Sequence, residues 1–99
     1  MIQILMPTYN GSKFLESQLE SLINQTNQDW KLLIRDDGSS DSTRLIIEKW
    51  AAAHPSKIYF LAEETDRLGA TGSFSRLLEY SSSSYVMLCD RMIFGFLIK

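Results

Sequence analysis

The sequence predicts an α/β protein with a doubly wound, mostly parallel sheet. Four short, mainly apolar segments alternate with three segments whose apolar residues recur at helical spacing. Strands that are joined through helices run parallel with right-handed crossovers, and the helices cover the faces of the sheet. Ligands of such sheets bind at the carboxyl ends of the strands, so the segments that directly follow strands are the candidates for a site.

The first strand and the first helix come early in the chain. The segment Ile2 to Met6 is almost entirely apolar, which favours a strand buried on both faces, and Pro7 is expected to end it. A turn at Asn10-Gly11 is expected to lead into a helix that extends to about Gln25. The residues expected on the buried face of this helix are Leu15, Leu19, Leu22 and Ile23.

A second strand and a second helix repeat the pattern. Lys31 to Arg35 is the second apolar segment, and the serines and acids that follow it favour a turn and a helix start. The helix is expected over about Ser42 to Ala53, because His54-Pro55 cannot continue it. The residues expected on its buried side are Ile46, Trp50 and Ala53.

The third helix is expected between two further strands. Ile58 to Ala62 and Tyr85 to Cys89 are the strands, and Ala70 to Tyr80 is the helix. Its inward residues are expected to be Phe74, Leu77 and Leu78, and the other aromatic residues expected in the core are Phe14, Trp30, Trp50 and Phe60. The predicted order is therefore β-α-β-α-β-α-β in one domain.

Length, charge and composition exclude several classes of protein. With 99 residues, 44% of them hydrophobic and 22% charged, the chain is expected to form one globular domain. A net charge of -2 has the wrong sign for neutralising phosphates, so no nucleic-acid partner is expected. One cysteine excludes an internal disulfide, and the longest apolar run is too short to span a bilayer. Without a recognisable signal peptide, the chain is predicted to be cytoplasmic.

Two neighbouring acids follow the second strand. Asp36 and Asp37 stand where the chain reaches the carboxyl edge of the sheet, directly before Gly38. Carboxylates in that place can accept hydrogen bonds from a base or a ribose, or hold a cation. They can equally cap the following helix, although the next two serines and Asp41 are also available for that. Residue chemistry alone leaves both alternatives open.

Two other segments between strands and helices carry candidate residues. The ring of Tyr9, beside Thr8, offers a stacking surface for a planar base, and the alternative is a tyrosine packed over a turn. Arg67 lies just before the third helix, where it could help to receive phosphate or simply be solvated. Neither a G-x-G-x-x-G motif nor a P-loop motif is present, which disfavours ordinary dinucleotide and P-loop sites.

Four segments together resemble one family. Ile4 to Gly11, Leu19 to Gln25, Leu33 to Thr43 and Gly69 to Phe74 look like the N-terminal, donor-binding half of a family 2 glycosyltransferase with the GT-A fold. The resemblance covers residues 1–90 and is strongest to bacterial members that add sugars, often rhamnose, to polysaccharide intermediates. It implies an inverting transfer from a nucleoside diphosphate sugar and, in intact relatives, a divalent manganese or magnesium ion.

The resemblance also implies roles for residues at the strand ends. The ring of Tyr9 would stack on the base, Asp37 would meet the base edge, and Asp36 would support Asp37. Asp90 would take the first position, on the ribose side, of the D-x-D-type acid cluster that follows the fourth strand. The residues expected to bind the nucleotide are Pro7, Thr8, Tyr9, Asp36, Asp37, Arg67 and Asp90.

The sequence departs from the family pattern after Asp90. Met92 stands where a metal-binding acid is expected, and a thioether does not replace a carboxylate for magnesium or manganese. The acceptor region and the catalytic base of the family have no counterpart here. No catalytic residue and no metal ligand are therefore expected, and the chain is expected to be a truncated, inactive donor-binding fragment.

The apolar tail 91–99 has a testable explanation. Residues 90–99 can be encoded so that one base inserted in the arginine codon changes them to Asp-Gln-Asp-Asp-Ile-Trp-Leu-Pro-Asp-Lys, which is the family pattern. We therefore hypothesise a one-base frameshift. Sequencing the encoding DNA tests it, and codons that do not fit the shifted reading would contradict it.

Other functions are open to the same fold. A signalling receiver domain also groups acids around magnesium, but its acid pair follows the first strand. A non-catalytic nucleotide-binding or interaction domain is the other alternative. Strands that would flank the fourth strand are missing from the prediction, so self-association is expected. Intact relatives are expected in the cytoplasm or peripherally at the inner face of the membrane.

Overall fold

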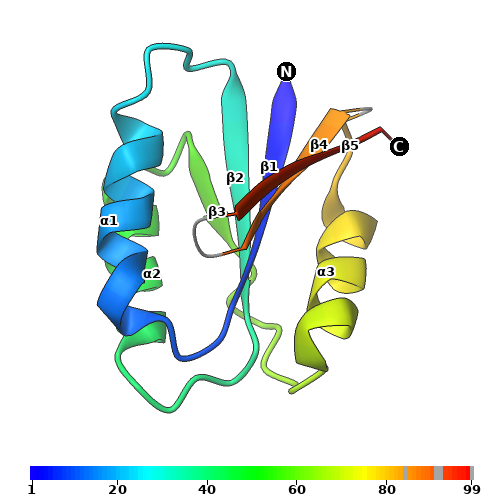
Figure 1. Ribbon diagram of the computed structural model, residues 1–99. Helices are drawn as coiled ribbons and strands as arrows, with labels where there is room; N and C mark the ends of the chain where they lie inside the picture. Colours follow the sequence, from blue (N-terminus) through cyan, green and yellow to red (C-terminus); the bar gives the residue numbers. More distant parts are fainter. Residues whose placement is uncertain (84, 91–92, 99) are drawn as a thin grey trace.

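The computed structural model describes residues 1–83, 85–90 and 93–98, with Asp90 and 93–98 described by their backbone alone. In this part of the chain the strands form one sheet in the order β3-β2-β1-β4-β5 (Figure 1). The elements in chain order are β1 (Ile2–Thr8), α1 (Ser12–Ile23), β2 (Trp30–Asp36), α2 (Thr43–Ala53), β3 (Ile58–Phe60), α3 (Gly69–Tyr80), β4 (Tyr85–Asp90) and β5 (Ile93–Ile98).

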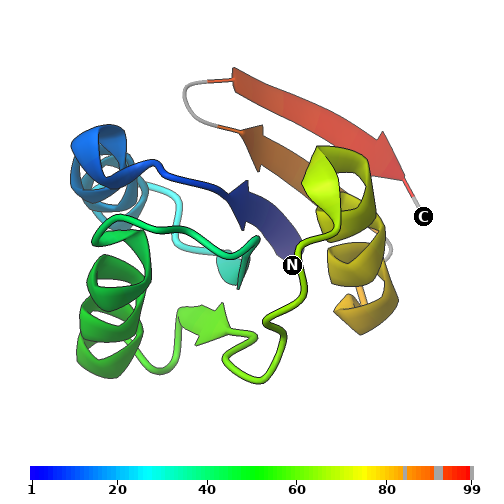
Figure 2. The same cartoon turned by 90° about the horizontal axis from the view of Figure 1, so that it is seen from below.

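The sheet is covered on both faces. α1 and α2 lie on one side and α3 on the other, as the view along the strands shows (Figure 2). β1 pairs in parallel with β2 and β4, and β2 pairs in parallel with β3. This arrangement confirms the predicted doubly wound α/β class. β5, for which the sequence predicts no strand, pairs antiparallel with β4 at the edge of the sheet, so the expectation that no further strand flanks the fourth strand is wrong.

Alternation along the strands builds a core on each face. Ile4 and Met6 of β1 point toward α1 and α2, where they pack with Leu19 and other buried residues. Leu5, between them, points to the opposite face and packs with residues such as Leu77 of α3. The strands are apolar on both faces because helices cover both, as expected for a parallel sheet.

Pro7 does not end the first strand. Its neighbour Thr8 accepts a hydrogen bond from the amide of Asp37 at 2.9 Å, so β1 stays paired with β2 beyond the proline. Backbone groups of successive strand residues point to opposite sides, which directs the nitrogen of Pro7 toward β4. Pairing between β1 and β4 ends at Leu5, so the missing N–H of the proline removes no ladder hydrogen bond there.

Two predicted core positions are wrong. On α2 the fully buried residues are Thr43 and Ile47, four residues apart, whereas Ala53 is exposed. Ile46 and Trp50 are partly buried against the core as predicted, so the buried face of the helix is centred about one residue away from the predicted one. Phe14 on α1 is 52% exposed rather than part of the core. It precedes Leu15, which is the residue of that turn that faces the sheet.

Asp41 connects the loop after β1 to the start of α2. Its carboxylate accepts hydrogen bonds from the hydroxyl and amide of Thr43 and from the amide of Ser12. The hydrogen bond from the Thr43 side chain is the main cause that lowers the Asp41 pKa from 3.8 to about 2.

This shift predicts a pH effect on stability. A carboxyl whose pKa is depressed in the folded state stabilises the fold above its unfolded pKa, and this contribution is lost as the pH falls through the folded value. Wild-type protein should therefore lose stability between about pH 4 and pH 2, and Asp41→Asn should reduce that slope. Urea unfolding at a series of pH values measures it. Because Asp41 is exposed, the change is expected to be small, and an identical slope in the variant would contradict the prediction.

Candidate functional site

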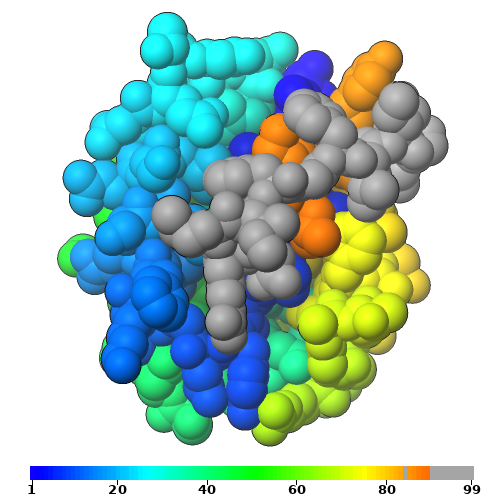
Figure 3. Space-filling model, viewed as in Figure 1, coloured from blue at the N-terminus to red at the C-terminus, as the bar shows by residue number. Residues whose placement is uncertain are grey.

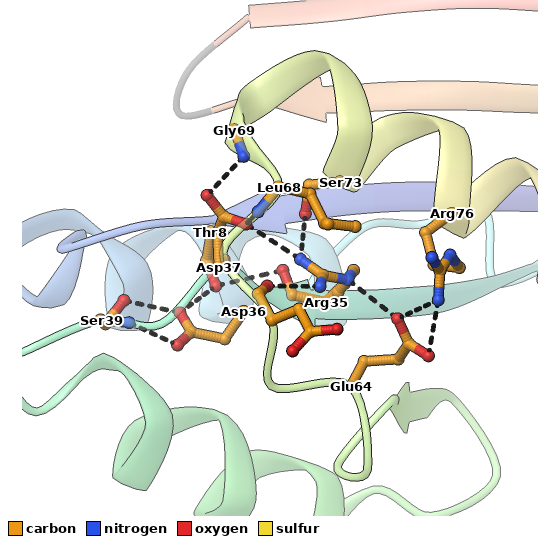
Figure 4. A network of polar contacts seen from close by, with 11 residues as sticks. Thr8, Arg35, Asp36, Asp37, Ser39, Glu64, Leu68, Gly69, Ser73 and Arg76 are labelled. Atoms are coloured by element: carbon orange, nitrogen blue, oxygen red, sulfur yellow. Dashed lines mark hydrogen bonds and ion pairs between the residues drawn. The ribbon is translucent and has the colours of Figure 1, made fainter.

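The carboxyl ends of β1 and β2 lie side by side at one edge of the sheet. Thr8 is in register with Asp36, and its hydroxyl donates a hydrogen bond to the Asp36 carboxylate at 2.8 Å (Figure 4). Asp36 also accepts hydrogen bonds from the hydroxyl and the amide of Ser39, at 2.6 and 2.9 Å. Asp36 thus fixes the turn after β2 to the end of β1.

Asp37 reaches a different element. Its carboxylate accepts hydrogen bonds from the amides of Leu68 at 2.7 Å and Gly69 at 3.0 Å, at the first turn of α3 (Figure 4). A carboxylate is favoured at a helix N-terminus by the helix dipole and the unpaired amides. The alternative in which the acid pair caps the next helix is therefore wrong, because Asp37 caps α3 instead. The amides of Leu68 and Gly69 at this helix start therefore already donate to a protein carboxylate.

Arg35 is a functional candidate that the sequence analysis missed. It is fully buried, and its guanidinium donates to the Asp37 carboxylate and to the Ser73 hydroxyl, both at 3.0 Å. It also donates to the backbone oxygen of Asp66 at 2.6 Å and contacts Glu64 at 3.3 Å (Figure 4). The signal in the sequence was a charged residue inside an apolar strand, directly before two acids.

A cavity of about 510 Å³ opens beside Asp37. We call it the strand-end cavity. In the space-filling view, the segment after β1 and the segment before α3 come together at this edge of the molecule (Figure 3). A volume in this range is typical of a small-molecule site. Its described lining residues are Pro7, Thr8, Tyr9, Gly11, Phe14, Leu15, Gln18, Asp37, Arg67, Gly69, Ala70 and Ser73.

Tyr9 and Arg67 meet in the strand-end cavity. The guanidinium carbon of Arg67 lies 4.1 Å from the centre of the Tyr9 ring, which is within the range of a cation–π contact. Tyr9 is 39% exposed, so part of its ring is open to solvent. The aromatic surface expected to stack on a base is thus present, and one arginine lies over it.

The structure brings together most of the predicted nucleotide-binding residues. Pro7, Thr8, Tyr9, Asp37 and Arg67 all line the strand-end cavity. Asp36 is 2% exposed and does not line the cavity, but its carboxylate accepts a hydrogen bond from the hydroxyl of Thr8, which does. The backbone of Asp90 ends β4 at the same edge of the sheet, but its side chain, with Arg91 and Met92, lies outside the described residues.

The carboxylates of Asp36 and Asp37 do not fit a divalent metal ion. Each accepts hydrogen bonds from protein donors on both oxygens. Among the side chains that the structure describes, no three histidine, cysteine, aspartate or glutamate residues gather as a metal site would require. In the same part of the chain, no helix is long and apolar enough to cross a membrane.

Gly69 has a backbone conformation that favours glycine. Its φ is +79°, whereas Gly11 at the start of α1 has φ −107°, and an added Cβ would meet no atom within 4 Å at either position. Gly69→Ala is therefore expected to destabilise the fold by about 1–2 kcal/mol through backbone strain. Gly11→Ala is the matched control and should cost clearly less. Equal unfolding free energies for the two variants would contradict this explanation.

Known proteins are similar to this chain over most of its length. A family model described as Glycosyl transferase family 2 matches residues 3–91. A curated relative from Escherichia coli, the UDP-Glc:alpha-D-GlcNAc-diphosphoundecaprenol beta-1,3-glucosyltransferase WfgD, is 32% identical over 91% of this chain and 34% of its own length. The dTDP-rhamnosyl transferase RfbG of Shigella flexneri is 36% identical over 85% of this chain and 29% of its own.

A solved structure agrees with these relatives. It is the mannosyltransferase PcManGT from Pyrobaculum calidifontis in complex with GDP-Man and Mn²⁺, with a TM-score of 0.80 and 26% identity over 91% of this chain. The match covers 27% of that structure. The chain therefore spans about a third or less of the length of these three proteins.

Proposed function

The chain belongs to glycosyl transferase family 2, and from that premise we propose that its strand-end cavity binds the nucleoside part of a nucleoside diphosphate sugar. One observation carries the proposal. A buried carboxylate, an exposed tyrosine ring and an arginine, contributed by Asp37, Tyr9 and Arg67, line a single cavity at the carboxyl edge of a parallel sheet. A planar base with N–H groups and a charged diphosphate needs this combination.

Each lining residue would have a distinct task. A carboxylate has about four acceptor positions. Three of those on Asp37 are used inside the protein, which leaves one on Oδ2 for an N–H of the base. The Tyr9 ring would stack on the base, with Pro7 and Thr8 forming the adjoining wall. Arg67 would leave the Tyr9 ring and bind the diphosphate, because a guanidinium prefers phosphate to an aromatic face.

We propose that a longer protein containing such a donor-binding unit transfers a sugar from a nucleoside diphosphate sugar to a saccharide acceptor. The transfer would take place in cell-surface polysaccharide synthesis, on the cytoplasmic side of the membrane. The matched relatives WfgD and RfbG, whose names give a glucosyl and a rhamnosyl transfer, support the class of reaction. Within the described residues we assign donor binding only.

We propose that this chain differs from the mannosyltransferase structure, which contains Mn²⁺, in how far its nucleotide binding depends on a divalent ion. Both oxygens of the Asp36 carboxylate and both oxygens of the Asp37 carboxylate accept hydrogen bonds from protein donors. Binding of the base should therefore depend little on manganese.

Titration calorimetry with UDP, GDP, dTDP and CDP, each with and without Mn²⁺, tests the proposal. We expect one nucleotide to bind better than the others, with an affinity that Mn²⁺ changes by less than threefold. Tyr9→Leu should weaken this binding. Tyr59→Leu is the matched control, because Tyr59 is 52% exposed and does not line the cavity. Failure of all four nucleotides to bind, or an equal loss in both variants, would contradict the proposal.

We further propose that the chain self-associates through the edge of its sheet. β5 is the edge strand beyond β4 in the described chain, and the sequence 93–98 contains no charged residue. Unpaired backbone groups along an edge strand pair readily with a second copy. Light scattering at micromolar concentration should give a mass above that of the monomer, and a monomeric mass would contradict this.

A further inference from the structure

We propose that Arg35 is a positioning residue for nucleotide binding, which holds the carboxylate of Asp37 in place at the strand-end cavity. The inference rests on the proposed function of that cavity. Arg35 itself does not line the cavity among the described residues, whereas its partners Asp37 and Ser73 do. Arg35 would therefore act on a ligand through Asp37 and not by contact.

The surroundings of Arg35 fix its guanidinium from several directions. The side chain is 0% exposed, and a buried cation is tolerated only when its donors are paired. Its partners come from three places in the fold: the end of β2, the segment between β3 and α3, and the first turns of α3. The planar, rigid set of five donors makes arginine suited to hold partners at fixed angles, which lysine cannot do.

The contacts of Arg35 divide into two groups. Toward the cavity, it bonds to Asp37 and Ser73, both at 3.0 Å. Away from the cavity, it contacts Glu64, which is also held by Arg76 at 2.9 and 3.1 Å. The two groups can be tested separately, because Glu64 does not line the strand-end cavity.

Fold stability alone does not require a buried ion pair at this position. Arg35 lies two residues after Leu33, on the face of β2 that packs toward α3 with Leu5 and Leu77. Replacing both partners of a buried ion pair by well-packed apolar side chains is often neutral or stabilising, whereas removing the arginine alone leaves Asp37 buried without its cation and is strongly destabilising. An apolar side chain cannot, however, hold a buried carboxylate toward the cavity. Without the Arg35 guanidinium, no cation would hold the Asp37 carboxylate toward the amides of Leu68 and Gly69, which donate hydrogen bonds to it.

Arg35→Met and Glu64→Gln form the test pair. Arg35→Met is expected to lower the affinity for the preferred nucleoside diphosphate at least tenfold and to speed hydrogen exchange of the Leu68 and Gly69 amides in the free protein at least tenfold. Glu64→Gln should keep both quantities within about threefold of wild type, even if it lowers the melting temperature. Combining Arg35→Met with Asp37→Asn should lose no more affinity than Asp37→Asn alone.

The outcomes separate the two proposals. If wild-type protein binds no nucleotide, the proposed function fails, and the exchange rates of Leu68 and Gly69 alone decide whether Arg35 positions Asp37. Unchanged exchange rates in Arg35→Met, or equal losses of affinity in Arg35→Met and Glu64→Gln, would overturn the positioning role. If Arg35→Met does not fold, Arg35→Lys is measured in its place. Hydrogen-exchange rates of the Leu68 and Gly69 amides in Arg35→Lys that equal those of wild type would then overturn the positioning role.

Discussion

Asp37→Asn is expected to lose at least tenfold in nucleotide affinity and about 3 kcal/mol in stability. The side chain of Asp37 is 7% exposed and accepts hydrogen bonds from the Arg35 guanidinium and from the Leu68 and Gly69 amides. An amide group would place an NH₂ against one set of these donors and would remove the negative charge beside a buried cation. For a domain of this size, the melting temperature should fall by roughly 12–24 °C.

Thermal unfolding and calorimetric titration of the same sample measure both effects of Asp37→Asn. Asp66→Asn is the matched control, because Asp66 is nearby and loses the same charge, but its side chain is exposed and does not line the strand-end cavity. The control should resemble wild type in both measurements. A similar loss of affinity in Asp66→Asn would mean that general electrostatics, rather than the geometry of Asp37, governs binding.

Arg67→Gln is expected to lower the affinity for a nucleoside diphosphate without lowering the affinity for the nucleoside itself. Arg67 lies over the Tyr9 ring at 4.1 Å, so it covers a surface on which the base would stack. Removing the guanidinium exposes that surface and should leave nucleoside affinity equal or higher. The same change removes a charge-assisted contact to the diphosphate worth about 1.5–3 kcal/mol, which corresponds to at least tenfold in affinity.

The comparison needs the nucleoside and the diphosphate of one base, titrated against wild type and Arg67→Gln. Arg44→Gln is the control, because Arg44 also lies over an aromatic ring, that of Phe60 at 4.8 Å, but outside the strand-end cavity. It should change neither affinity. Equal losses for nucleoside and diphosphate in Arg67→Gln would show that Arg67 does not bind phosphate.

Much of the fold could be predicted because local pattern and tertiary packing agree. The apolar segments that form β1 and β2 and the periodic leucines of α1 each indicate one structure only. Pro7 was expected to end β1, because the sequence does not show which side of a strand its nitrogen faces. The face of α2 was misplaced for a similar reason, since Ile46 and Ile47 are adjacent and both apolar.

The candidate site was predictable in its members but not in its connections. Tyr9, Asp37 and Arg67 could be placed at one edge, because parallel strands end there together. Which amides bond to Asp37 depends on how α3 approaches β2, and Leu68 is 31 residues away in the sequence. The contacts of Arg35 could not be predicted for the same reason, because three of its partners lie on segments far from it in the chain.

The central claim is that the strand-end cavity receives the nucleotide, and amide chemical-shift mapping by NMR tests it most directly. With the preferred nucleoside diphosphate added, the largest shifts should fall on Tyr9, Arg67 and Gly69, around the cavity. The amide chemical shifts of Tyr59 and Lys31, which do not line the cavity, should stay unchanged. Shifts centred on Tyr59 and Lys31, or no shifts at saturating nucleotide, would contradict the account.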